Sequence, residues 1–234
     1  MLRVNHACQQ AGRSPDEITI VAASKTRTPA EVLAALAAGI VHCGENRPEE
    51  AQPKIEEVWT QAEALGLPSP RWHMIGHVQS RKAKLVVGRY HLVHSLDSLR
   101  LAQRLSRLAE EQGPEMECLV EINVGGEESK YGYPAPAEDG AFAPSFLRDL
   151  EGMLELPALR ITGLMTMAPP VEHPDEARPY FRRLRLMRDR LREQFPHQDW
   201  RQLSMGMTDD FEAGILEGAT ILRIGRALFG PRSA

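Results

Sequence analysis

Lys25 is the residue with the clearest chemical potential, because it ends an otherwise apolar run, Ile18–Lys25 (ITIVAASK). A short run rich in β-branched residues predicts a strand that is buried on both faces. The ammonium group at its end would be partly desolvated, and desolvation lowers the pKa of an amine until it can attack a carbonyl and form a Schiff base. The alternative is a lysine that only ends the strand and extends its charge to water.

Two short segments near the end of the chain carry residue types that hold a phosphate. Ser204–Gly206 (SMG) offers a hydroxyl and backbone N–H groups directly before an expected helix start. Arg223–Arg226 (RIGR) offers a glycine, which lets a phosphate approach the backbone, beside a cation. Each segment alone is more often only a turn. Together with Lys25 they indicate a phosphate-bearing aldehyde as ligand.

The scaffold for these residues follows from an alternation of strand-like and helix-like segments. After the first run, Thr28, Pro29 and Glu31 have the pattern of a helix start, with a capping box and a proline at the first helical position. A further helix is expected before the first run. The eight strand-like runs are Ile18–Lys25, Ile40–Asn46, Trp72–Val78, Tyr90–Leu96, Glu117–Val124, Leu159–Met167, Arg201–Met207 and Thr220–Gly230. Other expected helices include Pro48–Leu65, Ser80–Val87, one ended by Gly113-Pro114, Pro144–Gly152 and one capped by Thr208–Asp210.

Strands that alternate with helices form parallel sheets through right-handed crossovers. Eight such units in 234 residues match a compact TIM (β/α)8-type barrel, so we expect an α/β fold of this kind with an extra N-terminal helix. A doubly wound open sheet shows the same alternation and is the alternative. No linker or break in composition interrupts the chain, so residues 1–234 are expected to form one domain.

In a TIM barrel the functional residues sit at the C-terminal ends of the strands. The barrel would therefore bring Lys25 and both phosphate-type segments to one rim. The residues expected at this rim are Lys25, Glu45, Asn46, His77, Ser95, Asn123, Met165, Ser204 and Arg223.

Composition narrows the class of protein. With 42% hydrophobic and 26% charged residues the chain is typical of globular proteins, which excludes disordered, collagen-like and disulfide-stapled classes. Its apolar runs are too short to span a membrane, and its start lacks the apolar stretch of a secretory signal, which favours the cytoplasm. Cys8, Cys43 and Cys118 are widely spaced and are expected to be reduced thiols.

The charge balance, 28 basic against 32 acidic residues, predicts no general attraction to nucleic acid. The local exception is Arg178–Arg192, which contains seven arginines. Tyr180, Leu184, Met187 and Leu191 recur there at helical spacing, so we expect a helix that packs by this face and exposes its arginines to solvent. A nucleic-acid or partner surface is the alternative.

The sequence also resembles the pyridoxal phosphate homeostasis protein family. The matching segments, in order, are VAASKTRTPAEV, HCGEN, WHMIGHVQSRKAKLV, HSLDSLRLA, INVGGEESKYGY, ITGLMTMAP and LSMGMTDDFEAGILEGATILRIGRALFG. They run from about Val21 to Gly230, and the most specific parts are SKT, IGHVQS and the last segment. The resemblance implies the alanine-racemase-like barrel of fold-type III pyridoxal phosphate proteins, with pyridoxal 5′-phosphate as cofactor and a role in vitamin B6 homeostasis.

The resemblance implies roles for the matched residues. Lys25 would hold pyridoxal 5′-phosphate as an internal aldimine, and Arg223 would face the pyridine nitrogen. Ser204, Gly225 and the Arg226 position would hold the phosphate. The full set of expected cofactor-binding residues is Lys25, Asn46, His77, Met165, Ser204, Met205, Arg223, Gly225 and Arg226, and no catalytic or metal-binding residue is assigned.

Three features depart from the family pattern. Arg226 stands where the family usually has threonine. Arg47–Glu49 replaces a segment that is usually of the Tyr-Val-Gln type. The loop Pro134–Pro144 is longer than is typical.

The expected function is to bind the cofactor without strong catalysis, and a racemase of low activity is the alternative. Racemisation needs two proton-transfer groups on opposite faces of the substrate α-carbon. Lys25 supplies one, and Tyr131 or Tyr133, in the loop after the fifth strand, could reach the mouth as the other. Arg223 argues against strong carbanion chemistry, because a guanidinium leaves the pyridine nitrogen facing it unprotonated and the ring a poorer electron sink.

Other partners receive little support from the sequence. A metal site built from His42, Cys43, His73 and His77 matches no ligand spacing. We expect pyridoxal phosphate as ligand, enzymes that require it as recipients, no nucleic acid, no membrane, and a monomer or weak dimer.

Overall fold

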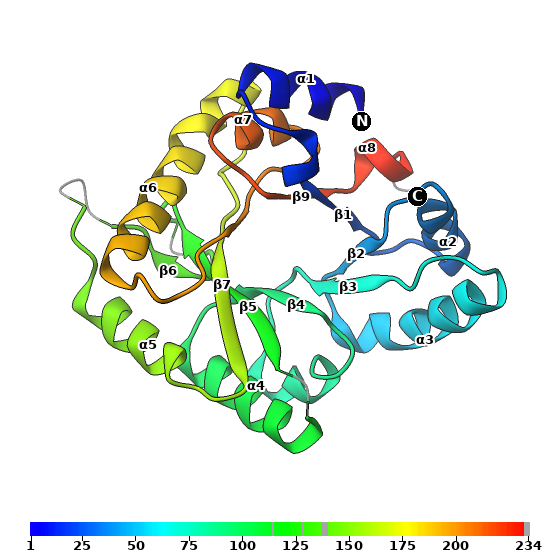
Figure 1. The fold of residues 1–234 in the computed structure, drawn as a ribbon, viewed down its shortest axis with the longest axis horizontal. Coiled ribbons are helices and arrows are strands. Elements are labelled where there is room, and N and C mark those ends of the chain that lie inside the picture. The colour runs from blue at the N-terminus through cyan, green and yellow to red at the C-terminus, as the bar shows by residue number, and fades with distance from the viewer. Residues whose placement is uncertain (114, 128, 137–139, 232–234) are drawn as a thin grey trace.

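Eight parallel strands close into a barrel in the computed structural model, which describes residues 1–113, 115–127, 129–136 and 140–231 (Figure 1). The strand β9 (Ile221–Ile224) pairs with β1 (Thr19–Ala23), and β4 (Leu92–Leu96) pairs with β5 (Met116–Asn123), so the sheet has no gap and the open-sheet alternative is excluded. The strands around the barrel are β1 (Thr19–Ala23), β2 (His42–Glu45), β3 (Arg71–Met74), β4 (Leu92–Leu96), β5 (Met116–Asn123), β7 (Leu159–Met165), β8 (Gln202–Ser204) and β9 (Ile221–Ile224).

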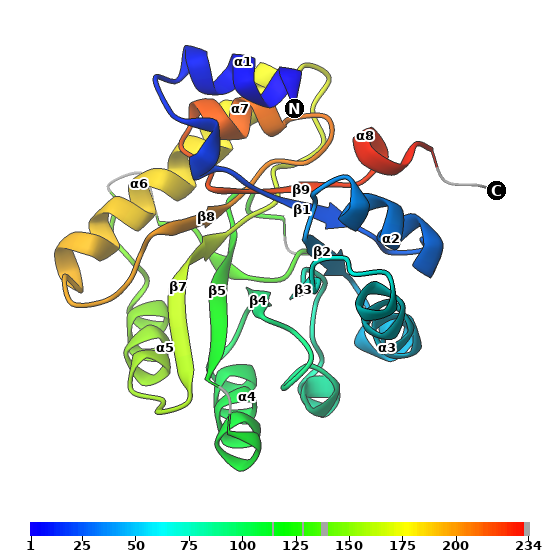
Figure 2. The ribbon, with the colours of Figure 1, turned by 45° about the vertical axis from the view of Figure 1, so that its right-hand side comes forward.

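Helices surround the barrel on its outside (Figures 1 and 2). The expected N-terminal helix, α1 (Leu2–Gln10), lies beside α7 (Phe211–Leu216), where Arg3 pairs with Glu212 at 2.6 Å. No helix in the described part of the chain is long and apolar enough to cross a membrane. The other helices are α2 (Pro29–Ala37), α3 (Pro48–Ala64), α4 (Leu99–Gln112), α5 (Pro144–Leu154), α6 (Arg178–Gln194), α7 (Phe211–Leu216), α8 (Arg226–Phe229) and the 3-10 helices η1 (Pro15–Glu17), η2 (Ser80–Leu85) and η3 (Pro174–Ala177).

Several local signals act as predicted. Thr28 caps α2 and forms a capping box with Glu31, while Pro29 begins the helix. Gly113 ends α4 in the left-handed conformation, with φ 94°. Pro114, the second half of that stop signal, and residues 137–139 of the Pro134–Pro144 loop lie outside the described residues.

Five details differ from the expected pattern. The segment after β3 forms a 3-10 helix, and a short strand, β6 (Tyr133–Pro134), pairs with β5. The last run is a strand only to Ile224, because α8 follows. On α6 the buried aromatic residue is Phe181 rather than Tyr180. Asp210 occupies the N-cap position of α7, but its side chain makes no capping hydrogen bond there; its carboxylate instead accepts a hydrogen bond from Met207 N at 2.6 Å.

Alternate residues of the strands point to two different cores. One face packs against the helices, and Cys8, Cys43 and Cys118 lie buried there as free thiols, as expected. The other face fills the barrel, where an apolar layer is formed by Val21, Leu92, Leu119, Met165 and Ile221. The barrel also encloses polar side chains, described below, so its interior is only partly apolar.

Gly163 in β7 provides a test of this packing. It lies where the register between β5 and β7 shifts, and a Cβ there would stand 1.9 Å from Gln202 O of β8, with φ 153°. We expect Gly163→Ala to lower the free energy of unfolding by about 3 kcal/mol or more, because strain and overpacking add. The control is Gly39→Ala, where φ is 87° but nothing lies within 4 Å; its cost should be about 1–2 kcal/mol. Urea denaturation measures both, and equal values would contradict the packing described here.

Candidate functional site

Lys25 lies in a tight turn directly after β1. Arg27 N donates to Ser24 O at 2.9 Å, and Thr26 has φ 66°, the one positive φ outside glycine among the described residues. A β-branched residue in this region is strained by about 1–2 kcal/mol, and such strain persists only where surrounding contacts impose it. The turn is therefore held in place by its neighbours.

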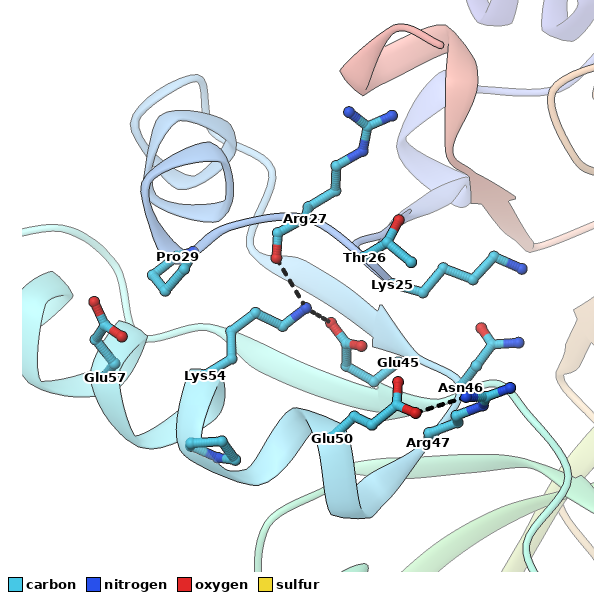
Figure 3. A pocket seen from close by; sticks show the side chains of 11 residues that line it. Lys25, Thr26, Arg27, Pro29, Glu45, Asn46, Arg47, Glu50, Lys54 and Glu57 are labelled. Carbon is cyan, nitrogen blue, oxygen red and sulfur yellow. Dashed lines mark hydrogen bonds and ion pairs between the residues drawn. The ribbon is translucent and has the colours of Figure 1, made fainter. Parts of the chain in front are cut away.

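Those neighbours come from α3 and β2. The Lys54 ammonium donates to Ser24 O at 2.9 Å and to Arg27 O at 3.2 Å, and pairs with Glu45 Oε1 at 2.6 Å. Ser24 Oγ donates to the same carboxylate oxygen at 2.7 Å. Both partners of the ion pair are nearly buried, with side chains 12% and 5% exposed. Figure 3 shows the Lys25 side chain extending away from Lys54 and Glu45.

Two hollows meet at Lys25. The first, of about 670 Å³, lies between the turn and α3, and includes Glu45, Asn46 and Lys54 (Figure 3). The second, of about 480 Å³, lies between the turn and the segments after β8 and β9. Lys25, Thr26 and Arg27 line both. The remaining residues of the second hollow are Ala23, Met207, Thr208, Asp209, Arg223, Gly225, Arg226 and Pro231.

The second hollow is positively charged. Four of its side chains are cationic, and Asp209 is its one acidic lining residue within the described chain. Arg226 donates to both oxygens of Asp209 at 2.6 Å, and Arg27 donates to Glu31 at 3.1 Å and to Gly230 O at 2.7 Å. The cations exceed the carboxylates, so this hollow suits an anion.

The backbone around Gly225 adds hydrogen-bond donors. A Cβ at Gly225 would meet only Ala23, at 3.7 Å, so the glycine leaves an open cradle at the hollow. Within the described residues, the amides of Gly225 and Arg226 donate to no other group. Thr208 stands opposite, and its Oγ1 accepts a hydrogen bond from Ala227 N at 3.4 Å. This cradle can bind the oxygens of an oxyanion.

The first hollow contains an unsatisfied polar atom. Asn46 Oδ1 is buried and has no hydrogen-bond partner among the described residues. A buried carbonyl oxygen without a partner costs about 1–3 kcal/mol. A ligand group that donates to it would remove this cost, so Asn46 is a candidate contact.

Arg223 lies inside the barrel at the edge of the second hollow. Its guanidinium donates to Ser204 Oγ at 2.5 Å and to Thr166 O at 2.8 Å. Burial lowers its pKa to about 10, so it stays protonated at neutral pH. Glu121 lies near it, and burial, together with the charge of Asp97, raises the pKa of Glu121 to about 7. Glu121 Oε2 has no partner among the described groups.

The sequence-predicted residues fall into two groups. Lys25, Arg223, Gly225 and Arg226 line the second hollow together, and Asn46 joins Lys25 in the first. The other four expected contacts, Met165, Met205, His77 and Ser204, line neither hollow.

Each of these four has a different structural role. Met165 belongs to the apolar layer inside the barrel, while Met205 packs outside it and its amide donates to Ile221 O at 3.1 Å. His77 stacks on Tyr131, with ring centroids 3.6 Å apart, and its Nδ1 lies 2.9 Å from Asp97. Ser204 is fully buried beneath Arg223.

Three residues that form or support the site were not predicted from the sequence. Thr208 lies two residues after the phosphate-type segment Ser204–Gly206, and this proximity was the available signal. Lys54 gave no signal, because one lysine on a helix resembles any other. His94 was overlooked, although a polar residue inside an apolar strand run marks a position of interest.

The remaining hypotheses gain no support. In the described ranges, no group of three or more His, Cys, Asp or Glu residues is placed to hold a metal ion. On α6, Arg178, Arg182 and Arg185 lie 2.9, 3.9 and 3.4 Å from the buried carboxylate of Glu217. This pairing reduces the positive charge that the helix presents to a nucleic acid.

Lys54→Met tests whether the ion pair holds the turn. Removing the ammonium leaves Glu45 buried and uncompensated, so the free energy of unfolding should fall by about 3–5 kcal/mol. The control is Arg47→Met, because Arg47 and Glu50 form a pair at the same hollow whose side chains are 68% and 62% exposed. That variant should lose less than about 1 kcal/mol. If urea denaturation gives the two variants equal stability, Lys54 does not hold the turn.

Comparison with known proteins adds independent findings. The family model described as the alanine racemase N-terminal domain matches residues 6–233. A protein of Aquifex aeolicus named pyridoxal phosphate homeostasis protein is 40% identical over 98% of this chain and 94% of its own. The protein of the same name from Pseudomonas aeruginosa is 40% identical over 98% of this chain and 91% of its own.

Solved structures agree with these matches. The structure of PipY from Synechococcus elongatus with PLP bound is 33% identical and superposes with a TM-score of 0.78, covering 97% of this chain and 100% of that one. An alanine racemase of Clostridium difficile superposes with a TM-score of 0.69 at 14% identity, over 100% of this chain and 56% of that one. The second likeness concerns the fold alone.

Proposed function

Because the chain belongs to the family of the alanine racemase N-terminal domain, we propose that it binds pyridoxal 5′-phosphate and serves in pyridoxal phosphate homeostasis. The observation that carries this proposal is the position of Lys25 between two hollows, one of them cationic and lined by backbone N–H groups that have no partner among the described residues. The cofactor is bound without strong catalysis by the protein itself.

The residues present fit this ligand. Gly225 leaves a cradle that a Cβ would fill, and Asn46 Oδ1 is buried without a described partner. When bound, pyridoxal phosphate supplies an aldehyde that condenses reversibly with an amine, and a phosphate that carries up to two negative charges.

Lys25 is the attachment residue. Lys25 lines both hollows, and Lys54, paired with Glu45, holds the turn that carries it. The amides of Gly225 and Arg226 and the hydroxyl of Thr208 bind the phosphate. Ser204 as a direct phosphate contact stays a prediction; we favour Thr208, because it lines the hollow, and assign Ser204 to holding Arg223.

Arg223 favours holding the cofactor over turning over a substrate. A guanidinium donates hydrogen bonds and accepts none, so a pyridine nitrogen facing it stays unprotonated. The racemase alternative needs a second proton-transfer group, and Tyr131 instead stacks on His77, outside the lining of both hollows. These observations support a binding role.

The wider setting is also part of the proposal. The recipients would be enzymes that require pyridoxal phosphate, and the protein would act in the cytoplasm as a monomer or weak dimer. The three free, buried cysteines support a reducing compartment.

The attachment residue can be tested by chemical labelling. Borohydride added to protein saturated with pyridoxal phosphate should fix the cofactor on the peptide that contains Lys25. Lys25→Ala should abolish this label, as read by peptide mass spectrometry. Lys130→Ala is the control, because Lys130 pairs with Glu127 outside both hollows and the label should remain. A label on a different lysine in the Lys25→Ala protein would show that the assignment is wrong.

The phosphate cradle has its own test. Charge-assisted hydrogen bonds contribute about 1.5–3 kcal/mol each, so pyridoxal should bind at least about a hundredfold more weakly than its phosphate ester. Gly225→Ala, and more strongly Gly225→Val, should weaken binding of the phosphate ester by at least about tenfold. The fold should tolerate alanine, since φ is −110° and the added Cβ stands 3.7 Å from Ala23.

Pyridoxal serves as the matched ligand, because it does not use the cradle and its affinity for Gly225→Ala should stay near that of the unchanged protein. Isothermal titration measures both ligands. An equal loss for the two would place the phosphate elsewhere.

A further inference from the structure

A chain of three histidines crosses the inside of the barrel and ends at Ser204. His42 Nδ1 lies 2.8 Å from His73 Nε2, and His73 Nδ1 lies 2.9 Å from His94 Nε2. His94 Nδ1 lies 2.8 Å from Ser204 Oγ, the oxygen that accepts from Arg223. The chain thus connects the first residue of β2, at the N-terminal end of the barrel, with the guanidinium at the hollow beside Lys25.

The three imidazoles are uncharged. His73 and His94 are 2% and 0% exposed, and burial lowers the pKa of both well below its usual value. Burial also lowers the pKa of His42 to about 4. The charged and titratable groups that act on the chain are Arg71 and His91 at its outer end and Arg223 at its inner end, and all of them lower these pKa values further.

A neutral imidazole carries one N–H, and each contact in the chain needs one donor. His73 and His94 make one of these contacts with each ring nitrogen, and His42 makes one with Nδ1 only. All three rings must therefore carry the proton on the same nitrogen, either Nε2 or Nδ1. If one ring moves its proton to its other nitrogen, the neighbouring ring must do the same.

Ser204 decides between the two arrangements. Its oxygen accepts from Arg223, and in the described contacts the acceptor for its own proton is His94 Nδ1. His94 then donates from Nε2 to His73, and His73 donates from Nε2 to His42. In the opposite arrangement His94 Nδ1 would donate to Ser204 Oγ. The hydroxyl proton of Ser204 would then point elsewhere, where the described contacts offer it no acceptor.

We propose that His94, backed by His73 and His42, is a positioning residue that turns the Ser204 hydroxyl proton away from Arg223. Ser204 then offers Arg223 only a lone pair, which fixes the guanidinium at the hollow. The three rings act as one unit. If the hydrogen bond between Ser204 and His94 reverses, His94 gains a proton on Nδ1, and one proton passes across each ring–ring contact. The last ring, His42, then loses the proton on its Nε2. The effect on the ligand rests on the proposed function, whereas the proton order does not.

Nitrogen NMR of the ligand-free protein tests the proton order. Protonated and unprotonated ring nitrogens have distinct shifts, and all three histidines should carry the proton on Nε2. Any one of them protonated on Nδ1 would overturn the proposal. Exposed His197 gives the reference signal for a ring outside the chain.

Ser204→Asp tests the coupling. A carboxylate accepts hydrogen bonds and donates none, so it should pair with Arg223 and draw a proton onto His94 Nδ1. All three rings, including His42 at the opposite end of the barrel, should then move their proton from Nε2 to Nδ1. In the double variant with His73→Phe, His42 should keep its Nε2 proton. A change at His94 alone in Ser204→Asp would overturn the coupling.

Ligand binding tests the positioning role. His94→Leu removes the acceptor for Ser204 and should weaken pyridoxal phosphate binding by about tenfold, since one charge-assisted bond is misdirected. His94→Asn places an oxygen near the former Nδ1 and should recover most of the affinity. Wild-type affinity in His94→Leu, or no recovery in a folded His94→Asn, would overturn the role. If the unchanged protein fails to bind pyridoxal phosphate, the proposed function fails while the NMR result stands.

Discussion

The burial of the Arg223 guanidinium inside the barrel is the constraint on which the polar side chains at the C-terminal ends of the strands depend. A buried charge costs several kcal/mol unless neighbouring groups replace its water, and Arg223 is 5% exposed. Ser204 Oγ and Thr166 O accept its hydrogen bonds, and the carboxyl groups of Glu121 and Asp210 favour its charged form. Ser204 in turn contacts His94, so polar side chains continue through an interior that other barrels fill with apolar ones.

Two separate sets of contacts thus position residues of the same hollow. From outside the barrel, α3 provides Lys54, which holds the strained turn that carries Lys25. From inside, the network around Ser204 holds Arg223. Lys54 lies on a helix and Ser204 on a strand, so both sets of contacts are anchored in regular elements of the barrel. A rigid frame of this kind suits a protein that holds its ligand in one orientation.

Much of this could be predicted from the sequence, because it depends on local patterns. The alternation of runs gave the barrel, and the capping box at Thr28 gave the start of α2. Other features depend on which way a side chain points. Helical spacing did not choose between the adjacent residues Tyr180 and Phe181, and in β8 and its extension Ser204 faces inward, so Met205 must face outward. The position of Lys54 could not be predicted, since it reaches the site through a contact between distant segments. Thr208 could have been included, because it lies close to Ser204–Gly206 in the sequence.

Closure of the barrel also fixes the order in which the two sides of the cationic hollow are synthesised. Strand β1 pairs with β9, with Thr19 opposite Ile221, so the two sides of the cationic hollow come from opposite ends of the sequence. A ribosome adds roughly 5–20 residues per second, so Lys25 precedes its partners in the hollow by on the order of tens of seconds. During that interval the lysine has no cradle beside it. The cationic hollow is therefore complete only after β9 has been added and has paired with β1, and a truncated chain that lacks β9 lacks this hollow.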